Sequence, residues 1–233
     1  MKIPIIVTGG DGKFAKTLKL KNKKLNLKCL SKKELNILSI KSIENCLIKY
    51  KPKIIIHTAG LSRPMEQHNS NISKSIDLNI IGTANIVKCC KKFNIKIIYF
   101  SSVYVYDGLK GNFKETDPTK PINNYALSKM GGECAVLMYK NSLVLRIQMT
   151  EKPFLYNKAF SDVFTNFMFH EDLVSILPKL INEFGIINVG GKKQSVYHFA
   201  KIYNKNVKKI KNNLKLPSNQ TMNLTKLKKI LKK

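Results

Sequence analysis

The sequence has no tryptophan, only two arginines, and 14 acidic residues among 233. It contains no run of about 18 apolar residues, so no membrane-spanning helix is expected. It also has no CxxC pair, and no histidine lies near a cysteine at metal-ligand spacing. The five cysteines therefore predict no metal site and suit a reducing compartment. Because the amino terminus lacks the features of a signal peptide, a soluble cytoplasmic protein is predicted.

The scarcity of acidic residues leaves a formal net charge of +28, nearly all of it from lysine. Such a charge is typical of nucleic-acid-binding proteins. Base and phosphate recognition relies on arginine, however, and the chain has only Arg63 and Arg146. The lysines are spread along the chain among many asparagines and isoleucines, as a coding bias would produce. We therefore predict no specific nucleic-acid site, although the charge should attract polyanions at low salt.

Short apolar runs alternate with stretches of helical periodicity along most of the chain. Runs such as residues 53–58 are continuously apolar, which is typical of strands buried on both faces of a parallel sheet. The alternation predicts an α/β fold with a Rossmann-like, doubly wound parallel sheet. The predicted strands cover residues 4–8, 25–30, 53–58, 96–101, 143–146 and 185–189. The predicted helices cover residues 14–19, 40–50, 75–93, 125–139, 171–182 and 195–203.

The regularity weakens after Arg146. Residues 1–147 are predicted to form the main domain, and residues 148–233 a small C-terminal lobe interleaved with it. Residues 148–166 are expected to be a loop. The tail after residue 200 has no acidic residue, but its apolar residues Leu224, Leu227, Ile230 and Leu231 recur at helical spacing. This pattern predicts a docked terminal helix rather than a free basic arm.

A glycine-rich segment, TGGDGKFA (Thr8–Ala15), follows the first predicted strand and opens the first predicted helix. This is the context of a dinucleotide-binding turn. Glycines allow a close backbone approach, and the N–H groups and dipole of a helix amino terminus attract a pyrophosphate. Such a turn can also be a plain connector, and the carboxylate of Asp11 would repel a diphosphate unless it points to water.

Tyr125 and Lys129 lie four residues apart at the start of a predicted helix, and therefore on one face of it. A neighbouring ammonium favours the phenolate and lowers the pKa of a tyrosine from about 10. Ser101 and Ser102 end a predicted strand, where open α/β sheets gather their ligands. The pair alone is often a surface contact. Together with the turn, these residues predict a site that exchanges a proton with a carbonyl or an alcohol.

Several motifs in the right order resemble the extended short-chain dehydrogenase/reductase superfamily. They are TGGDGKFA (8–15), HTAG (57–60), DLNIIGTANIV (77–87), YFSSVYVYDG (99–108) and YALSKMGGE (125–133). Within the superfamily, the dTDP-4-dehydrorhamnose reductases look most similar. That similarity rests on residues 103–133 and on LVLRI (143–147), GIINVGG (185–191) and LPSNQTMNLTKLKKIL (216–231).

The resemblance implies NAD(P)H-dependent reduction of the 4-keto group of a nucleotide-activated 4-keto-6-deoxy sugar, in deoxysugar synthesis for a surface glycan. It makes residues 1–147 the NAD(P)-binding domain and the C-terminal part a shortened substrate lobe. Tyr125 would be the proton donor, Lys129 its pKa-lowering partner and a ligand of the nicotinamide ribose, and Ser102 the hydroxyl that orients the substrate carbonyl. Asn79 would support the active-site helix. The implied cofactor contacts also include Gly9, Gly12, Lys13, Phe14, Asn36, Ile37, Ala59, Gly60 and Leu61.

The end of the second predicted strand bears on the choice of cofactor. An acidic side chain there would hold a ribose 2′-hydroxyl, and a basic one a 2′-phosphate. The segment contains Ser31 and Lys32, which we count as cofactor contacts. NADPH is therefore predicted, with NADH possible.

Two departures from the family affect the substrate site. Val103 follows Ser102 where the rhamnose reductases usually have an acidic residue, and residues 147–150 replace an aromatic segment. Ser102, Val103 and Arg63 are the expected substrate contacts, with Arg63 or Arg146 able to meet a diphosphate. One alternative is a nucleotide-sugar epimerase or dehydratase with tightly bound NAD. Another is a non-catalytic NADP-binding regulatory subunit. A homodimer is expected from the resemblance.

Overall fold

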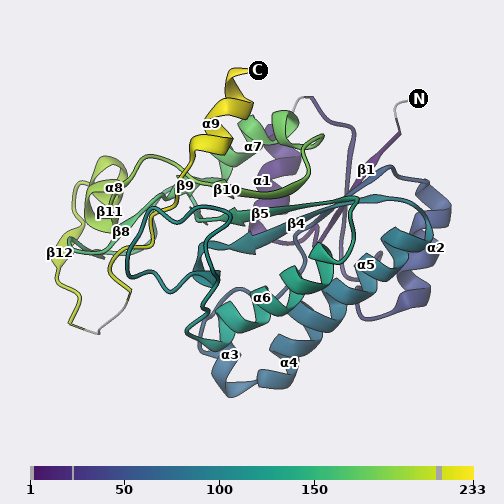
Figure 1. Ribbon diagram of the computed structural model, residues 1–233, viewed down its shortest axis with the longest axis horizontal. Helices are drawn as coiled ribbons and strands as arrows, with labels where there is room; N and C mark the ends of the chain where they lie inside the picture. Colours follow the sequence, from purple (N-terminus) through teal and green to yellow (C-terminus); the bar gives the residue numbers. More distant parts are fainter. Residues whose placement is uncertain (1–2, 23, 214–216) are drawn as a thin grey trace.

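A six-stranded parallel sheet forms the centre of the molecule (Figure 1). The computed structural model describes residues 3–22, 24–213 and 217–233. The strand order is β10-β5-β4-β3-β1-β2, and all neighbouring pairs are parallel. The predicted Rossmann-like α/β fold is therefore confirmed. The strands are β1 (Ile5–Thr8), β2 (Leu27–Leu30), β3 (Ile54–His57), β4 (Lys96–Ser102), β5 (Ser142–Ile147) and β10 (Gly185–Val189).

Helices cover both faces of this sheet. Successive strand residues point to opposite faces, so Ile98 belongs to one apolar cluster and Ile97 to the other. The first cluster is covered by α1 (Lys13–Lys21), α7 (His170–Leu180) and α9 (Thr225–Lys232), and the second by α2 (Ile40–Tyr50), α5 (Gly82–Lys92) and α6 (Asn124–Leu137) (Figure 1). Burial of both faces explains the continuous apolar runs in the sequence.

The direction in which strands are added reverses at β1. From β1 the chain moves outward to β2, then crosses to the other side of β1 and adds β3, β4, β5 and β10 in turn. The segments that leave β1 and β3 at the carboxyl edge of the sheet therefore run to opposite faces. Open α/β sheets bind ligands at such a point, so the fold itself indicates where a site should lie.

The long helix expected over residues 75–93 is interrupted. It consists of α4 (Ile72–Ile76), a π-helical turn η1 (Asp77–Ile81) and α5. Asn79 lies in the π turn with its side chain buried. Helical periodicity predicts the apolar face of α5 but not the π turn, which is a rare interruption of an α-helix that is found frequently at functional sites.

The C-terminal lobe contains more strand than the sequence suggested, and the expectation that residues 148–166 form a loop was wrong. That segment contains β6 (Met149–Thr150), β7 (Lys158–Phe160) and β8 (Phe164–Thr165). Their partners are β9 (Met168–Phe169), β12 (Lys208–Ile210) and β11 (Gln194–Ser195), respectively. Two- and three-residue strands are too short to show periodicity. The lobe has a small core of its own, in which Phe199 of α8 (Val196–Tyr203) packs with Phe154 and Phe169.

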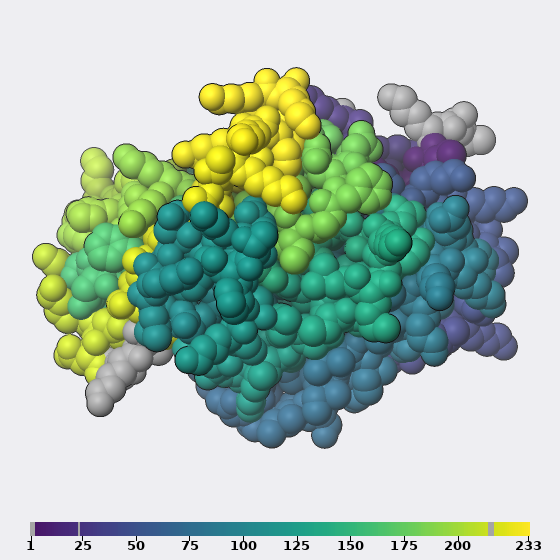
Figure 2. Space-filling model, in the orientation of Figure 1, coloured from purple at the N-terminus to yellow at the C-terminus, as the bar shows by residue number. Residues whose placement is uncertain are grey.

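The last elements of the chain return to the main sheet. α7 covers one face of the sheet and β10 forms an edge strand. α9 packs against α7 and β10 (Figure 2). Leu227 and Ile230 are buried there, and Lys226 donates to the carbonyl of Ile186 at 2.7 Å. The predicted docked terminal helix is therefore confirmed, although Leu216, the first residue of the tail motif, lies outside the described residues. The division of the chain at residue 147 stays a prediction.

Candidate functional site

The glycine-rich turn after β1 is built for close approach. Gly9 has a φ of +70°, and a Cβ on it would lie 2.8 Å from the Cα of Ala59. A Cβ on Gly10 would lie 2.7 Å from the carbonyl of Cys29. Gly12 is the N-cap of α1 and has no side chain, so no N-cap side chain accepts hydrogen bonds from the first turn of this helix. The turn thus leaves backbone N–H groups available for an anion at the point where the fold predicts a ligand.

Phe14 and the segment after β3 form the walls beside this turn. Phe14 is buried against Phe100 of β4, with ring centroids 4.9 Å apart. The Asn79 side chain accepts from the N–H of Leu61 at 2.7 Å and donates to its carbonyl at 2.8 Å. A Cβ on Gly60 would lie 2.7 Å from the Asn79 oxygen. The expected cofactor residues Ala59, Gly60 and Leu61 therefore lie across from Gly9 and are held rigidly.

The end of β2 is less favourable to a 2′-phosphate than the lysines suggested. The hydroxyl and the N–H of Ser31 both donate to a carboxylate oxygen of Glu34, each at 2.8 Å. These hydrogen bonds lower the pKa of Glu34 and keep it ionised. Lys32 is exposed. Ile37 is buried beside Gly82 and α5, while the Asn36 oxygen accepts from the N–H of Leu38 at 3.1 Å.

Ser102 and Tyr125 come together at the carboxyl end of β4. Asn123 caps α6 by accepting from the N–H of Ala126 at 2.8 Å, and this cap sets where the helix begins. A hydrogen bond with Ser102 lowers the pKa of Tyr125, but burial outweighs it and the pKa of Tyr125 is raised overall. The rings of His68 and Tyr104 contact Tyr125 at centroid distances of 5.0 and 5.9 Å. The phenol is thus fixed in place and protonated at neutral pH.

Lys129 lies one helical turn after Tyr125, with its ammonium 4.3 Å from the centre of the Tyr99 ring. Burial lowers the pKa of Lys129 to about 7, and the Glu133 carboxylate acts in the opposite direction. The expected lowering of the Tyr125 pKa by Lys129 is not found: Lys129 is not among the groups that shift it, and the shift is upward. A buried ammonium with a pKa near 7 is itself able to exchange a proton at neutral pH.

Asn79 links these residues to the wall of the crevice. Besides Leu61, its side-chain amide donates to the Ser128 hydroxyl at 2.8 Å, and Ser128 donates to the carbonyl of Tyr125 at 2.8 Å. Asn79 is therefore joined to α6 by a chain of hydrogen bonds, while its role in supporting an active site stays a prediction. These hydrogen bonds join the π turn, the β3 segment and the first turn of α6.

A buried ion pair lies directly behind the site. Arg146 of β5 donates to Glu133 of α6 at 2.6 and 3.1 Å, and the Ser101 hydroxyl donates to the same carboxylate at 2.5 Å. Arg146 also donates to the Tyr106 hydroxyl at 2.7 Å. The idea that Arg146 could meet a substrate diphosphate is therefore wrong, because the residue is 3% exposed and its guanidinium is committed to internal partners.

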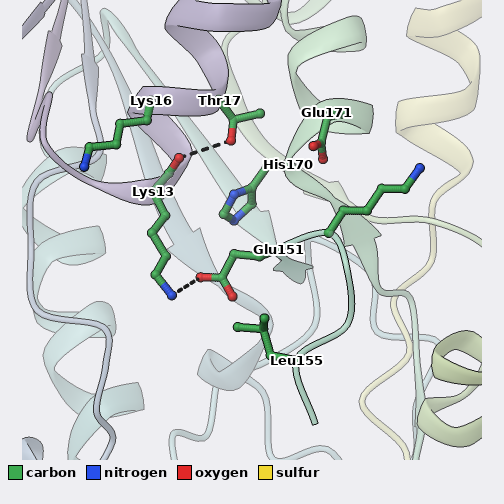
Figure 3. Close-up of a pocket in the computed structure, with 8 residues that line it drawn as sticks. Lys13, Lys16, Thr17, Glu151, Leu155, His170 and Glu171 are labelled. Carbon is green, nitrogen blue, oxygen red and sulfur yellow. Dashed lines mark hydrogen bonds and ion pairs between the residues drawn. The ribbon is translucent and has the colours of Figure 1, made fainter. Parts of the chain in front are cut away.

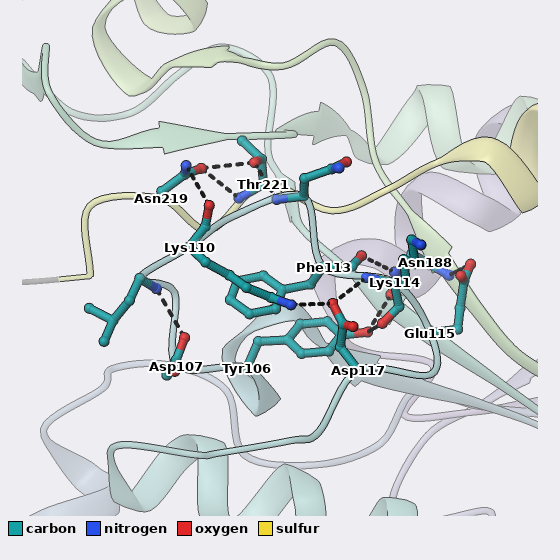
Figure 4. A network of polar contacts seen from close by, with 12 residues as sticks. Tyr106, Asp107, Lys110, Phe113, Lys114, Glu115, Asp117, Asn188, Asn219 and Thr221 are labelled. Atoms are coloured by element: carbon teal, nitrogen blue, oxygen red, sulfur yellow. Dashed lines mark hydrogen bonds and ion pairs between the residues drawn. The ribbon is translucent and has the colours of Figure 1, made fainter.

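Tyr106 carries this network into the loop before α6 (Figure 4). Its hydroxyl also contacts the Asn188 side chain at 3.0 Å and the Lys114 carbonyl at 2.9 Å, and its ring stacks on Phe113. The C-terminal segment fastens the same loop, since the N–H of Phe113 donates to the carbonyl of Thr221 at 3.0 Å. The loop that leads to Tyr125 is thus anchored on β5, β10 and the tail.

Residues 1–176 match the family described as the RmlD substrate binding domain. The chain belongs to this family. The dTDP-4-dehydrorhamnose reductase of Aggregatibacter actinomycetemcomitans is 28% identical over 151 residues, which cover 63% of this chain and 51% of that protein. Methionine adenosyltransferase 2 subunit beta of Bos taurus is 33% identical over 131 residues, 54% of this chain and 36% of that protein. The chain thus matches only about half or less of the length of these curated relatives.

Solved structures related to the RmlD family share the fold. The dTDP-4-dehydrorhamnose reductase from Bacillus anthracis, in complex with NADP, superposes with a TM-score of 0.86 and covers 98% of this chain and 91% of that chain at 22% identity. A hypothetical dTDP-4-dehydrorhamnose reductase from Sulfolobus tokodaii superposes with a TM-score of 0.83, covering 97% of this chain and 94% of that chain at 23% identity. The enzyme WbmG of Bordetella bronchiseptica, in complex with NAD, superposes with a TM-score of 0.75 at 16% identity, covering 97% of this chain and 86% of that chain.

In this RmlD-family chain, the two remaining expected substrate contacts lie in different surroundings. Val103 begins the short helix η2 (Val103–Val105) and is 1% exposed, packed in a cluster with Phe113 and Met222. Arg63 is exposed and donates to Glu151 at 3.3 Å. Lys13 also pairs with Glu151, at 2.8 Å, beside a hollow that His170 lines (Figure 3). The structure therefore links Arg63 through Glu151 to the first turn of α1 and places Val103 in the core.

Sequence reasoning missed three acidic residues of this RmlD-family site: Glu34, Glu133 and Glu151. Glu133 lies four residues after Lys129 and so had a signal on the same helix face. Glu34 and Glu151 had none, because their partners are set by turns and by tertiary contacts. Within the described part of the chain, no group of three metal-ligating side chains is found, and no helix is long and apolar enough to span a membrane.

Proposed function

We propose that this chain is an NAD(P)H-dependent reductase that converts the 4-keto group of a nucleotide-activated 4-keto-6-deoxy sugar to an alcohol, in deoxysugar synthesis for a surface glycan. The observation that carries the proposal is the pairing of Ser102 with Tyr125 at the carboxyl edge of the sheet, the same edge at which the glycine-rich turn leaves β1. By the same family resemblance we propose a cytoplasmic homodimer.

The residues around the β1 turn fit a dinucleotide. Gly9 and Gly12 would let the diphosphate approach the amino terminus of α1, and Ala59, Gly60 and Leu61 would lie along the riboses. Bound there, the reduced dinucleotide supplies the hydride. Lys129 would bind the nicotinamide ribose through its ammonium group. Burial lowers the pKa of this group, and the Glu133 carboxylate favours its charged form. We propose NADPH as the cofactor, with NADH as the alternative.

Tyr125 and Ser102 would carry the proton chemistry. Because burial raises its pKa, Tyr125 stays a neutral phenol at physiological pH and can donate its proton to a developing alkoxide. Ser102 would hold the carbonyl oxygen in line with that phenol. The hydrogen bonds from Asn79 to Ser128 and from Ser128 to the Tyr125 carbonyl would hold the first turn of α6 in place beside the proposed site. These roles are acid catalysis by Tyr125 and orientation by Ser102.

A second candidate is a non-catalytic subunit that retains the fold and the cofactor site. The similarity to a protein whose name is methionine adenosyltransferase 2 subunit beta supports it, at 33% identity over 131 residues. The burial of Val103 also supports it, because it leaves the residue after Ser102 without a polar group toward a substrate. Such a subunit would bind a dinucleotide without turnover.

The test is the absorbance of reduced nicotinamide in a mixture of this protein, NADPH or NADH, and a 4-keto-6-deoxy sugar nucleotide generated in place. The reductase predicts loss of absorbance in proportion to the protein added. Binding of NADPH with no loss of absorbance would favour the subunit. Purification with one equivalent of NAD retained, and no net consumption of NADPH, would favour an epimerase or dehydratase.

The Glu34 carboxylate is expected to weaken binding of a 2′-phosphate. Replacing Glu34 with glutamine removes a negative charge from Ser31, so NADPH should bind roughly three- to tenfold more tightly while the dissociation constant of NADH changes little. Calorimetric titration of both cofactors measures this. Glu44→Gln, which removes a half-buried charge paired with the exposed Lys92, is the matched control. Equal gains for NADPH and NADH would contradict the assignment of Glu34 to the 2′ position.

A further inference from the structure

Glu151 joins two cations that belong to different walls of the proposed cofactor site. Its carboxylate accepts from Lys13, on the first turn of α1, at 2.8 Å, and from Arg63, on the segment after β3, at 3.3 Å. The Glu151 side chain is only 18% exposed, whereas those of Lys13 and Arg63 are 68% and 44% exposed. A single carboxylate from the C-terminal lobe therefore spans from the diphosphate turn to the opposite segment.

Both cations lie where an anionic ligand would need them. Lys13 opens the helix whose amino terminus faces the proposed diphosphate. Arg63 is close enough to Tyr125 and Tyr104 for its charge to lower the pKa of both phenols. Lys13 and Arg63 outweigh the effect of burial and lower the pKa of Glu151, so its charge persists at neutral pH. Figure 3 shows its side chain between Lys13 and His170.

We infer that Glu151 is a resident counter-anion that closes this crevice, and that a dinucleotide diphosphate must displace its carboxylate from Lys13 and Arg63 in order to bind. The inference rests on the proposed function for the class of ligand. Glu151 is then a gating residue. Cofactor binding breaks the ion pair between Glu151 and Arg63, so Arg63 becomes free near Tyr125 in the same step. Arg63 is then free to meet the anionic part of a sugar nucleotide only after the cofactor has entered.

The local structure allows the carboxylate to leave while the backbone stays. Glu151 directly follows β6, which pairs with β9, and the segment after it is held by the buried Phe154. Lys152 lies over the rings of Phe169 and Tyr203 at 5.9 and 5.5 Å. A change of side-chain rotamer at Glu151 is therefore sufficient to open the contact, because the residues on either side are fixed.

The test compares Glu151→Gln with Glu171→Gln by calorimetric titration of NADPH. Glu171 lines the same hollow but has no ion pair among the described residues, so its replacement is a matched control. Gating predicts that Glu151→Gln binds NADPH roughly three- to tenfold more tightly than the wild type, since half-exposed ion pairs no longer have to be broken. The control should bind like the wild type.

The salt dependence of binding is a second readout that a purely structural role would not move. Freed of Glu151, Lys13 and Arg63 should both contribute to phosphate binding, so the affinity of Glu151→Gln for NADPH should fall more steeply with added NaCl than that of the wild type. A carboxylate that merely tethers the lobe predicts the opposite outcome for its removal: weaker binding and an unchanged salt slope. That outcome overturns the inference.

Inorganic pyrophosphate separates failure of this inference from failure of the proposed function. If neither protein binds NADPH but Glu151→Gln binds pyrophosphate more tightly than the wild type, the gate stands and the cofactor assignment fails. If both bind NADPH equally, the gate fails and the cofactor assignment stands. If neither protein binds NADPH or pyrophosphate, the gate and the cofactor assignment both fail. Should Glu151→Gln not fold, Glu151→Asp keeps the charge with a shorter reach and must show a smaller gain in the same direction.

Discussion

Replacing Tyr125 with phenylalanine is expected to lower the rate of 4-keto sugar nucleotide reduction by about 10²- to 10⁴-fold, the range typical of losing a general acid. The dissociation constant of NADPH should stay nearly the same. Phenylalanine keeps the ring that packs against His68 and Tyr104, so the start of α6 is preserved and only the hydroxyl is lost. The measurements are single-turnover absorbance at the reduced-nicotinamide band and calorimetric titration of NADPH.

The matched control for this prediction is Tyr139→Phe. Tyr139 lies just after α6, at the opposite end of the helix from Tyr125, and its hydroxyl donates to the carbonyl of Cys90 at 3.4 Å. Its replacement removes an identical atom without touching the proposed site, so turnover should be retained. Equal, measurable rates for Tyr125→Phe and the wild type would refute acid catalysis by Tyr125, whereas no turnover in either protein would favour the non-catalytic subunit.

The fold was predictable because its signals are local and repeated. Each parallel strand buries both faces, so runs such as residues 54–56 are apolar throughout, and connecting helices place apolar residues on the face toward the sheet. The lobe gave no such signal, since its strands have two or three residues and pair with segments far along the chain. The π turn at Asn79 also gave no sequence signal. The Asn79 side chain is bonded to the backbone of Leu61, a tertiary contact that helical spacing does not reveal.

The residue types of the candidate site could be predicted from the sequence. The protonation of its groups and the ion pairs that they form could not. Tyr125, Lys129 and Ser102 follow from spacing and from the ends of predicted elements, and the structure places them at one edge of the sheet. The lowering of the Lys129 pKa to about 7 comes from burial, which no spacing reveals. The carboxylates on Ser31 and between Lys13 and Arg63 likewise depend on tertiary contacts. A lysine-rich sequence suggested open cationic sites, and folding neutralises several of them.

The largest effect on stability is expected at the buried pair between Arg146 and Glu133. Arg146→Met should lower the free energy of unfolding by about 3–5 kcal/mol, because it leaves the fully buried Glu133 carboxylate without its cation. Of the hydrogen-bond partners that the structure gives Glu133, only the Ser101 hydroxyl would remain, and the Lys129 charge does not hydrogen-bond to it among the described contacts. Urea unfolding followed by far-ultraviolet circular dichroism measures the loss.

Two comparisons distinguish burial from the bare presence of an ion pair. Lys92→Met breaks the pair between Lys92 and Glu44, whose 2.7 Å separation is close to the 2.6 Å of the buried pair but which lies on the surface, and stability should hardly change. The double variant Glu133→Leu with Arg146→Met removes both buried charges and should recover most of the loss. Equal losses in Arg146→Met and in the double variant would mean that the shape of these side chains, rather than the uncompensated charge, holds α6 against β4 and β5.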